Sequence, residues 1–242
     1  MKKCNIMGVN VCVTNMKEVI NTVTDELNNW RGDYICVANV HTTVTSYEDE
    51  NYLKIQNGAA LVLPDGGPLS RYCRKKGFAD AERVTGPDFM REILSISKET
   101  GWRHLFYGST QETLDKLQVV IEEKYQGAVI CDMISPPFRP LTVSEDEEIV
   151  NRINNANPDF IWVGLGAPKQ EIWMAAHENR VNGLMIGVGA AFDYESGNIK
   201  RAPNWMQKCN LEWLYRLMQD PKRLFKRYLI TNTKYIVWKN NN

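Results

Sequence analysis

Six short apolar runs, separated by amphipathic helical patterns, occupy the first 190 residues of the chain. Each run is five to seven residues long and ends in or beside Gly, Asp or Asn, which are residues that begin turns. Uninterrupted apolar strands separated by helices indicate a parallel sheet that is covered by helices on both faces. The sequence therefore predicts an α/β fold with a mostly parallel sheet. The runs are residues 34–39, 60–65, 104–108, 128–133, 160–166 and 184–190.

Helix-start signals precede most of the intervening segments. Small polar side chains accept hydrogen bonds from the free N–H groups of a first helical turn, and proline fits the first helical position. We expect core helices over residues 16–30 after Thr14 or Asn15, 86–99 from Gly86, 111–125 after Ser109 or Thr110, 145–156 after Ser144 and 169–181 after Pro168. Two more helices are expected in the C-terminal tail, over residues 205–219 and from Asp220-Pro221 onward.

Polar and glycine-rich segments follow the predicted strands at their carboxyl ends, where open α/β sheets bind their ligands. Glycines let the backbone approach a ligand closely, and a helix start presents free N–H groups to a phosphate. The turn Gly164-Leu165-Gly166 has this pattern but lacks the third glycine of a dinucleotide fingerprint, so a simple strand-to-helix turn explains it equally well. The residues of interest at this edge are Asn39, Asp65, Gly108, Gly164, Gly166, Lys169, Gln170 and Gly189.

Asp65 is the carboxylate whose position most suggests catalysis. It ends an apolar run, is followed by Gly66 and Gly67, and has no adjacent Lys or Arg. A carboxylate at a strand end can take a proton from a substrate as a general base. The alternative is structural, because an aspartate before residues 67–76 would also serve as the N-cap of a helix.

The sequence contains no clear metal-ligand pattern, and we expect neither a metal nor a cofactor. Acidic clusters at residues 47–51 and 144–148 lie in polar helical segments and are typical of solvated faces. His104 and His177 are typical of packing or surface positions, whereas His41 lies at a strand end and stays a candidate. The missing P-loop and Gly-x-Ser-x-Gly motifs weaken nucleoside-triphosphatase and hydrolase interpretations.

Cysteine usage and hydropathy indicate the compartment. The six cysteines form no CxxC pair, which is typical of free thiols in a reducing environment. No run of 18 apolar residues occurs, and polar interruptions near the N-terminus argue against a signal peptide. The sequence therefore predicts a cytoplasmic protein that is at most peripheral to a membrane.

Charge is unevenly distributed although the formal net charge is zero. Residues 200–242 hold ten Lys/Arg and two Asp/Glu, a net of +8, so residues 1–199 carry −8. Arg223 and Arg227 lie four residues apart, on one helix face, among aromatic residues. Such an amphipathic helix is typical of proteins that lie on an anionic membrane surface, and a solvated face is the alternative. Nucleic acid is not expected as a partner, because the rest of the chain is acidic and no nucleic-acid-binding motif occurs.

Five longer motifs occur in a fixed order along the chain. They are LPDGG at 63–67, RVTGPDF at 83–89, GAPKQEIW at 166–173, GVGAAFDYESGNIKRAPNW at 187–205 and LEWLYRLMQDPKRLFKRY at 211–228. Together they closely resemble the WecG/TagA/CpsF glycosyltransferases of bacterial cell-surface polymer synthesis. The resemblance covers essentially the whole chain, and the last two motifs are long and specific.

The resemblance implies an architecture and a reaction. The architecture is a Rossmann-like catalytic core, residues 1–195, with a basic, aromatic C-terminal helical appendage, residues 196–242, that contacts membrane and diphosphate. The reaction is an inverting, metal-independent transfer of N-acetylmannosamine from UDP-N-acetylmannosamine to undecaprenyl-diphosphate-N-acetylglucosamine, which builds the teichoic acid linkage unit. Such an enzyme acts on the inner face of the cell membrane and self-associates through its core as a homo-oligomer.

The resemblance also implies roles for individual residues. Asp65 matches the proposed general base, and Arg216, Arg223 and Arg227 match appendage arginines that meet diphosphate. The substrate-binding residues predicted in total are Asn39, Arg83, Gly108, Gly164, Gly166, Lys169, Gln170, Gly189 and Arg201. One departure concerns the first strand end, where the Thr-Pro-Asn of the teichoic acid branch is replaced by Val37-Ala38-Asn39.

Three alternatives stay open at this point. The same family with another donor, UDP-N-acetylmannosaminuronic acid or UDP-glucose, would serve a capsule, an exopolysaccharide or an enterobacterial-type antigen. A non-catalytic membrane-associated adaptor would fit the basic tail. A nicotinamide-dependent oxidoreductase would fit the α/β pattern and the glycine turns.

Overall fold

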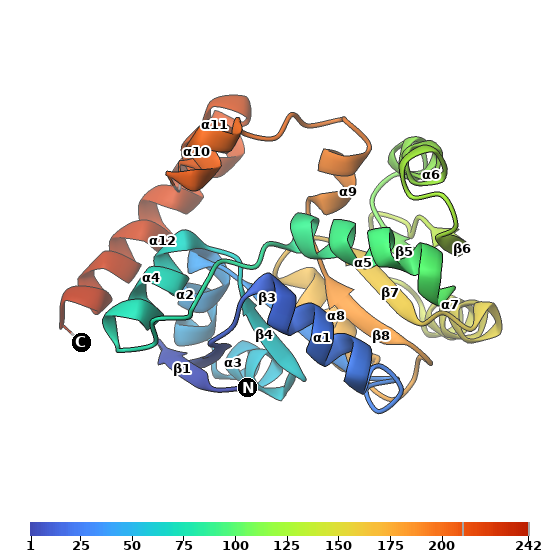
Figure 1. The fold of residues 1–242 in the computed structure, drawn as a ribbon, viewed down its shortest axis with the longest axis horizontal. Helices are drawn as coiled ribbons and strands as arrows, with labels where there is room; N and C mark the ends of the chain where they lie inside the picture. Colours follow the sequence, from blue (N-terminus) through green and yellow to red (C-terminus); the bar gives the residue numbers. More distant parts are fainter. Residues whose placement is uncertain (210, 242) are drawn as a thin grey trace.

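The computed structural model describes residues 1–209 and 211–241, and its centre is a six-stranded parallel sheet (Figure 1). The strand order is β4-β3-β8-β7-β5-β6. The strands are β3 (Tyr34–Ala38), β4 (Leu61–Pro64), β5 (Arg103–Gly108), β6 (Val129–Ile134), β7 (Phe160–Gly164) and β8 (Leu184–Gly187). Each one falls on a predicted apolar run, so the predicted α/β class with a parallel sheet is confirmed.

Two hydrophobic layers enclose the sheet, because successive side chains of a strand point to opposite faces. Ile161 and Val163 belong to one buried cluster, whereas Phe160 and Trp162 belong to the other. One layer is covered by α1 (Met16–Glu26), α5 (Gly86–Thr100), α6 (Gln111–Lys124) and α9 (Ala191–Glu195). The other is covered by α2 (Val40–Glu48), α3 (Glu50–Gly58), α4 (Gly67–Lys75), α7 (Val143–Ala156) and α8 (Lys169–Ala176).

Local capping interactions determine where the helices begin. Asn15 caps α1 and Thr110 caps α6, as predicted. The predicted start of α7 after Ser144 is wrong by two residues, because Thr142 forms a capping box with Glu145. Helix α8 begins at Lys169 as predicted but ends at Ala176, shortly before Asn179 adopts a left-handed backbone with φ 58°.

An N-terminal hairpin, β1 (Lys3–Ile6) with β2 (Val9–Cys12), was not expected from the sequence. Met7 and Gly8 form its two-residue turn with φ angles of 53° and 89°, the conformation that antiparallel hairpins favour. Buried and exposed residues alternate in β1, whereas in β2 every residue but Asn10 is buried; the polar–apolar alternation around Gly8 is the signal that would have identified the hairpin.

The C-terminal segment crosses the molecule and returns along its side. Residues 196–203 lead from α9 to α10 (Asn204–Lys208), which is followed by α11 (Glu212–Gln219) and α12 (Pro221–Asn241) (Figure 1). The single helix predicted over residues 205–219 is wrong, because the Leu211 N–H donates to the Met206 carbonyl in a wide turn that ends α10. Residue 210, within that predicted helix, lies outside the described residues.

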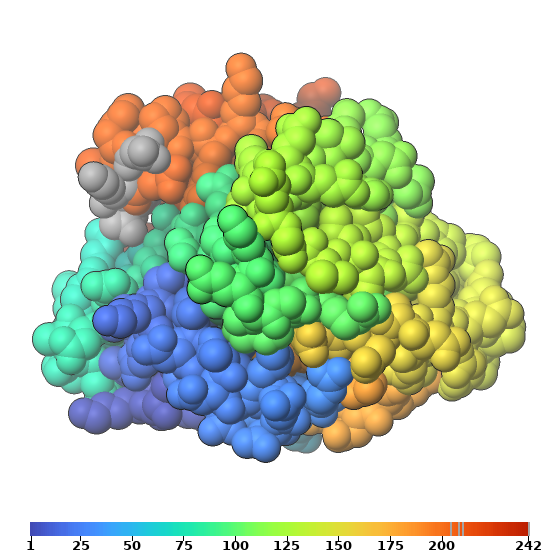
Figure 2. Space-filling view, turned by 45° about the vertical axis from the view of Figure 1, so that its right-hand side comes forward, coloured from blue at the N-terminus to red at the C-terminus, as the bar shows by residue number. Residues whose placement is uncertain are grey.

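Helix α12 packs against the core. Leu224 and Tyr235 are buried, the Tyr235 hydroxyl donates to the Pro68 carbonyl at 3.1 Å, and the Trp238 ring lies 5.3 Å from that of Tyr72. Lys234 pairs with Glu48 of α2. In the space-filling view the orange C-terminal segment, with red behind it, lies at the upper left of the molecule (Figure 2).

The predicted boundary between residues 195 and 196 coincides with the end of α9, and the division into two functional units stays a prediction. Among the helices of the described chain, none has both the length and the apolar character needed to cross a membrane.

We predict that Tyr235→Ala loosens the docked C-terminal helix. Removing a buried aromatic side chain should destabilise the docked state by about 3 kcal/mol, so backbone amides of residues 221–241 should exchange faster with deuterium while those of α5 keep their protection. Phe225→Ala, on an exposed position of the same helix, is the control. Equal exchange in the two variants would contradict the docking.

Candidate active site

A cavity of about 1640 Å³ opens at the carboxyl edge of the sheet. The segments that follow all six strands contribute to its lining, and α11 and α12 close it from the side of the C-terminal segment. Pockets for a single small ligand usually measure about 300–1,000 Å³. This cavity therefore has room for two substrates at once.

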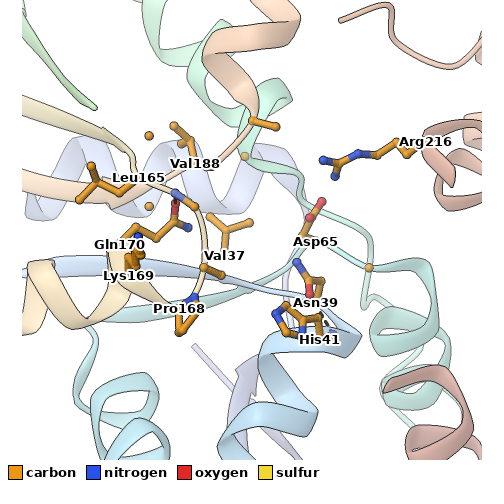
Figure 3. A pocket seen from close by; sticks show the side chains of 18 of the residues that line it. Val37, Asn39, His41, Asp65, Leu165, Pro168, Lys169, Gln170, Val188 and Arg216 are labelled. Carbon is orange, nitrogen blue, oxygen red and sulfur yellow. Dashed lines mark hydrogen bonds between the residues drawn. The ribbon is translucent and has the colours of Figure 1, made fainter. Parts of the chain in front are cut away.

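Asn39 and Asp65 lie side by side in the cavity wall because β3 and β4 pair in parallel with Ala38 opposite Pro64 (Figure 3). The Asp65 N–H continues this pairing by donating to the Ala38 carbonyl at 2.8 Å. The Asn39 side-chain oxygen accepts from the N–H groups of His41 and Thr42, at 3.0 and 3.2 Å, and so caps α2. The N–H groups of the first turn of α2 therefore fix the orientation of the Asn39 side chain.

The Asp65 side chain is not used to cap a helix. Gly66 is the N-cap of α4, and no side chain accepts a hydrogen bond there. The N-cap alternative for Asp65 is therefore wrong, and 28% of its side chain stays exposed towards the cavity. Burial raises the pKa of the Asp65 carboxyl above its ordinary value, and the cations Arg83 and Arg216 partly oppose this shift. A raised pKa brings a carboxylate closer to the range in which a general base works at neutral pH.

A chain of ion pairs links the core to the C-terminal segment through the cavity. The Arg83 Nε donates to the Asp65 main-chain oxygen at 2.6 Å, and its Nη2 donates to Glu212 Oε2 of α11 at 2.5 Å. That same Nη2 lies 3.8 Å from the nearest Asp65 carboxylate oxygen. Both terminal nitrogens of Arg201 donate to the Asp88 carboxylate, and the Arg201 Nε lies 3.6 Å from Glu212 Oε1. Arg83 and Arg201, both predicted to bind substrate, thus meet on one carboxylate.

The turn between β7 and α8 is held by side chains from its own helix. The Gly166 N–H donates to Gln170 Oε1 at 3.1 Å, and Gln170 Nε2 donates to Glu171 Oε1 at 2.9 Å. A side-chain carbon at Gly187 would come within 3.0 Å of Gln170 Nε2, so glycine leaves room for this glutamine. The Gly166 N–H is consequently satisfied within the protein, which favours the strand-to-helix turn over the phosphate-cradle interpretation at this position.

Glu171 is a fully buried carboxyl beside this turn. Among the described residues its Oε2 has no hydrogen-bond partner of good geometry; burial raises the pKa of Glu171 above its ordinary value, and the side chains of Gln170 and Tyr52 partly oppose this shift. An unpaired buried carboxyl is far cheaper to keep neutral than ionised. Burial therefore favours the neutral form of Glu171, and its Oε1 supports Gln170 by accepting from Gln170 Nε2.

Arginines from α11 and α12 reach the opposite side of the cavity. Arg216 points towards Asp65 (Figure 3), and its guanidinium lies 5.6 Å from the centre of the Tyr194 ring. Arg223 pairs with Asp220 at 2.5 Å. Burial, together with the positive charges of Arg223 and Arg216, lowers the pKa of Arg227. Within the described chain neither Arg216 nor Arg227 forms an ion pair with a carboxylate, although the charges of Asp65 and Glu212 act on Arg216 at longer range.

The cavity gathers the predicted site residues with one exception. A side-chain carbon at Gly108 would lie 2.7 Å from the backbone of Gly164, so Gly108 is required for strand packing and does not line the cavity. The predicted residues that line it are Asn39, Asp65, Arg83, Gly164, Gly166, Lys169, Gln170, Gly189, Arg201, Arg216, Arg223 and Arg227.

Several residues of the site were not expected from the sequence. Glu212 and Asp88 complete the ion pairs, and the buried hydroxyl of Tyr194 has no hydrogen-bond partner among the described residues. His41, by contrast, was a candidate from the sequence; it lines the cavity, and burial together with the charge of Arg227 lowers the pKa of its imidazole. The described residues contain no group of three or more His, Cys, Asp or Glu placed to hold a metal ion.

The parallel sheet, and the large cavity at its carboxyl edge with charged side chains in its wall, are typical of an α/β enzyme. The model of the glycosyl transferase WecG/TagA/CpsF family matches residues 4–240, so the chain belongs to this family and is a glycosyltransferase. The oxidoreductase alternative is therefore not retained.

Curated relatives from Staphylococcus aureus strains MW2, NCTC 8325 / PS 47 and MRSA252 are each 28% identical over 225 residues. The similarity covers 92% of this chain and 87% of each relative. All three are named N-acetylglucosaminyldiphosphoundecaprenol N-acetyl-beta-D-mannosaminyltransferase.

We predict that Glu171→Gln flattens the dependence of stability on pH. Because the folded state raises the pKa of Glu171, it holds a proton that the unfolded chain has lost; this stability is complete below the unfolded pKa and declines as pH rises towards the folded pKa. Glutamine removes this titration and can still accept from Gln170. Urea unfolding at about pH 5 and about pH 8 should show a smaller loss of unfolding free energy for Glu171→Gln than for the wild type. Glu178→Gln, at an exposed position, should lose as much as the wild type.

Proposed function

We propose that this glycosyltransferase moves N-acetylmannosamine from UDP-N-acetylmannosamine to N-acetylglucosamine carried on an undecaprenyl diphosphate, by a metal-independent reaction that inverts the anomeric carbon. The names of the relatives support the sugar and the lipid acceptor. The observation that carries the proposal is the arrangement of Asp65, whose carboxyl faces a cavity with room for two substrates, opposite Arg216, which forms no direct ion pair in the described chain. By the resemblance, the product is the linkage unit of wall teichoic acid.

In the proposed step, the acceptor hydroxyl attacks the anomeric carbon of the donor sugar from the face opposite the UDP group. The new C–O bond forms as the bond between the anomeric carbon and the phosphate oxygen breaks, and UDP departs with the bonding electrons. Asp65 accepts the proton of the attacking hydroxyl. Its raised pKa suits this role, since a carboxylate of ordinary pKa is a weak base at neutral pH.

The departing diphosphate gains negative charge that the enzyme must stabilise. Arg216 and Arg227 are among the cations of the cavity that have no carboxylate partner in the described chain, and Lys169 is exposed at the opposite wall. Charge-assisted hydrogen bonds from such groups stabilise a developing phosphate charge strongly in a site that excludes water. We assign Arg216 and Arg227 to the diphosphates, with Arg223 at the rim, where it pairs with Asp220.

The C-terminal segment suits a lipid-linked acceptor. Phe225, Leu229 and Ile236 are exposed at helical spacing on α12, and Trp213 and Met218 are exposed on α11. An amphipathic helix with exposed apolar residues and clustered arginines binds the interface of an anionic bilayer. We propose that α11 and α12 rest on the inner face of the membrane and hold the cavity near the acceptor headgroup.

The identity of the donor sugar has a second candidate. Val37 lines the cavity at the strand end where the resembling teichoic acid branch has threonine, so one hydroxyl is missing from the wall. That change favours an altered donor, UDP-N-acetylmannosaminuronic acid or UDP-glucose, which would place the enzyme in capsule, exopolysaccharide or antigen synthesis.

Release of UDP tests the reaction directly. Full-length protein is mixed with a short-chain polyprenyl-diphosphate-N-acetylglucosamine acceptor and a panel of UDP-sugars, with EDTA present. Release with UDP-N-acetylmannosamine that depends on acceptor supports the proposal. Release only with another donor would assign the enzyme to the synthesis of another surface polymer. No release with any donor, even after anionic vesicles are added, would support the non-catalytic adaptor alternative instead.

We predict that Asp65→Asn reduces the turnover of the transfer reaction by about 10²–10⁴-fold, which is the usual contribution of a general base. The amide has nearly the same shape, so UDP binding measured by calorimetry should be retained. Because Asp65 must be ionised, wild-type turnover should fall as pH drops through its raised pKa. Turnover of Asp65→Asn close to that of the wild type would rule out the base assignment.

We predict that replacing Phe225 and Leu229 together by serine weakens binding to anionic vesicles by roughly tenfold or more, because two exposed apolar side chains no longer enter the bilayer interface. Sedimentation with vesicles of mixed phosphatidylglycerol and phosphatidylethanolamine measures the effect. Val119→Ser, at an exposed apolar position of α6, should bind like the wild type. Unchanged sedimentation of the double variant would refute the membrane role of α12.

A further inference from the structure

We propose that Glu212 is a positioning residue that draws the Arg83 guanidinium away from the Asp65 carboxylate and so keeps that carboxylate free to accept a proton. Glu212 is largely buried at the cavity wall, with 12% of its side chain exposed, and it comes from α11 of the C-terminal segment. The inference rests on the proposed role of Asp65 as the base.

The geometry around Arg83 carries the argument. Its Nε is fixed on the Asp65 main-chain oxygen at 2.6 Å, so the guanidinium cannot leave the neighbourhood of Asp65. Its Nη2 nevertheless donates to Glu212 at 2.5 Å and stays 3.8 Å from the Asp65 carboxylate. Two carboxylates thus compete for one nitrogen, and Glu212 has the shorter contact.

Glu212 is itself held in place from its other side. The Arg201 Nε lies 3.6 Å from Glu212 Oε1, and the terminal nitrogens of Arg201 are occupied by Asp88 of α5. Attraction to two guanidinium groups stabilises this position of the Glu212 carboxylate against rotation to another rotamer. The arrangement therefore fixes the position of Arg83 only while α11 is docked.

Without the Glu212 charge, the Asp65 carboxylate is the anionic partner that remains within reach of Arg83. Its Nη2 needs to move by about 1 Å to reach ordinary charge-assisted hydrogen-bond distance from the Asp65 carboxylate. An arginine held by both the backbone and the carboxylate of one residue would stabilise the ionised form of that residue. Asp65 would then hold its negative charge more firmly and take a proton less readily.

Other groups around Asp65 do not replace this function. Arg216 favours the ionised carboxylate, whereas Asp88 and Glu212 favour the protonated form. Of these two acids, Asp88 is bound to Arg201 and forms no ion pair with Arg83 in the described part of the chain, so Glu212 is the one of the two that acts on the position of the Arg83 nitrogen. The charged and titratable groups that face Asp65 are Arg83, Asp88, Tyr194, Glu212, Arg216 and Tyr228.

A carboxyl NMR titration tests the inference without relying on activity. In full-length protein labelled with ¹³C at aspartate carboxyls, the Asp65 signal is the one lost in Asp65→Asn. We expect its pKa to be lower in Glu212→Gln than in the wild type, and to be restored towards the wild type in Glu212→Asp. Glu99→Gln, an equal change of charge at an exposed position of α5, should leave it unchanged. An unchanged pKa of Asp65 in Glu212→Gln would overturn the inference.

The same titration in an Arg83→Gln background separates positioning from simple charge repulsion. If Glu212 acts by holding Arg83, its replacement should shift the Asp65 titration much less when Arg83 is absent. If Glu212→Gln shifts the Asp65 pKa equally with and without Arg83, Glu212 acts only through the direct repulsion between its charge and that of Asp65. That result would also overturn the inference.

Turnover supplies the link to function. Glu212→Gln should reduce the rate of UDP release by about tenfold, which is a part of what a general base contributes. In its pH–rate profile, the fall in turnover on the acid side should occur at lower pH than in the wild type. A purely structural role would reduce turnover without shifting the pH of this fall. If the wild type releases no UDP with any donor, the proposed function fails, while the NMR titrations still decide the role of Glu212.

Discussion

Parallel hydrogen bonding between six strands is the constraint on which the rest of this structure depends. Strands that run in one direction bring all their carboxyl ends to one edge, and each must be followed by a helix that returns the chain. The burial of both faces leaves that edge as the place where polar side chains can gather. Asn39 and Asp65 are neighbours because β3 and β4 are paired in this way, not because of their separation in the sequence.

Much of the core and part of the site could be predicted from the sequence, because both depend on local patterns. Apolar runs located the strands, and the residue that ends the second run, Asp65, was identified as the central carboxylate. The N-terminal hairpin was missed because its strands are only four residues long each, and the break between α10 and α11 was missed because it arises from a main-chain hydrogen bond to Met206. Gly108 was misplaced because glycine at a strand end serves packing as readily as ligand approach.

The role of Glu212 could not be predicted, because it depends on contacts between distant parts of the chain. In the sequence it is one of two acids in a basic tail, with nothing to mark it as different from a solvated residue. In the structure it meets Arg83 and Arg201 inside the cavity. The separation of charge between the tail and the rest of the chain is thus only partly matched by ion pairs: Lys234 and Glu48 neutralise each other, whereas Arg216 and Arg227 have no carboxylate partner among the described residues.

Helix α2 has a consequence for how this sequence can vary. Its first turn is capped by Asn39 at the cavity, and α12 packs along it, with Lys234 paired to Glu48. A substitution that changes how α12 packs therefore also affects α2, the helix whose first turn holds the Asn39 side chain. The segments 40–48 and 221–241, which lie near opposite ends of the sequence, are constrained to change together, and a chimera that exchanges the tail alone would inherit a mismatched partner surface.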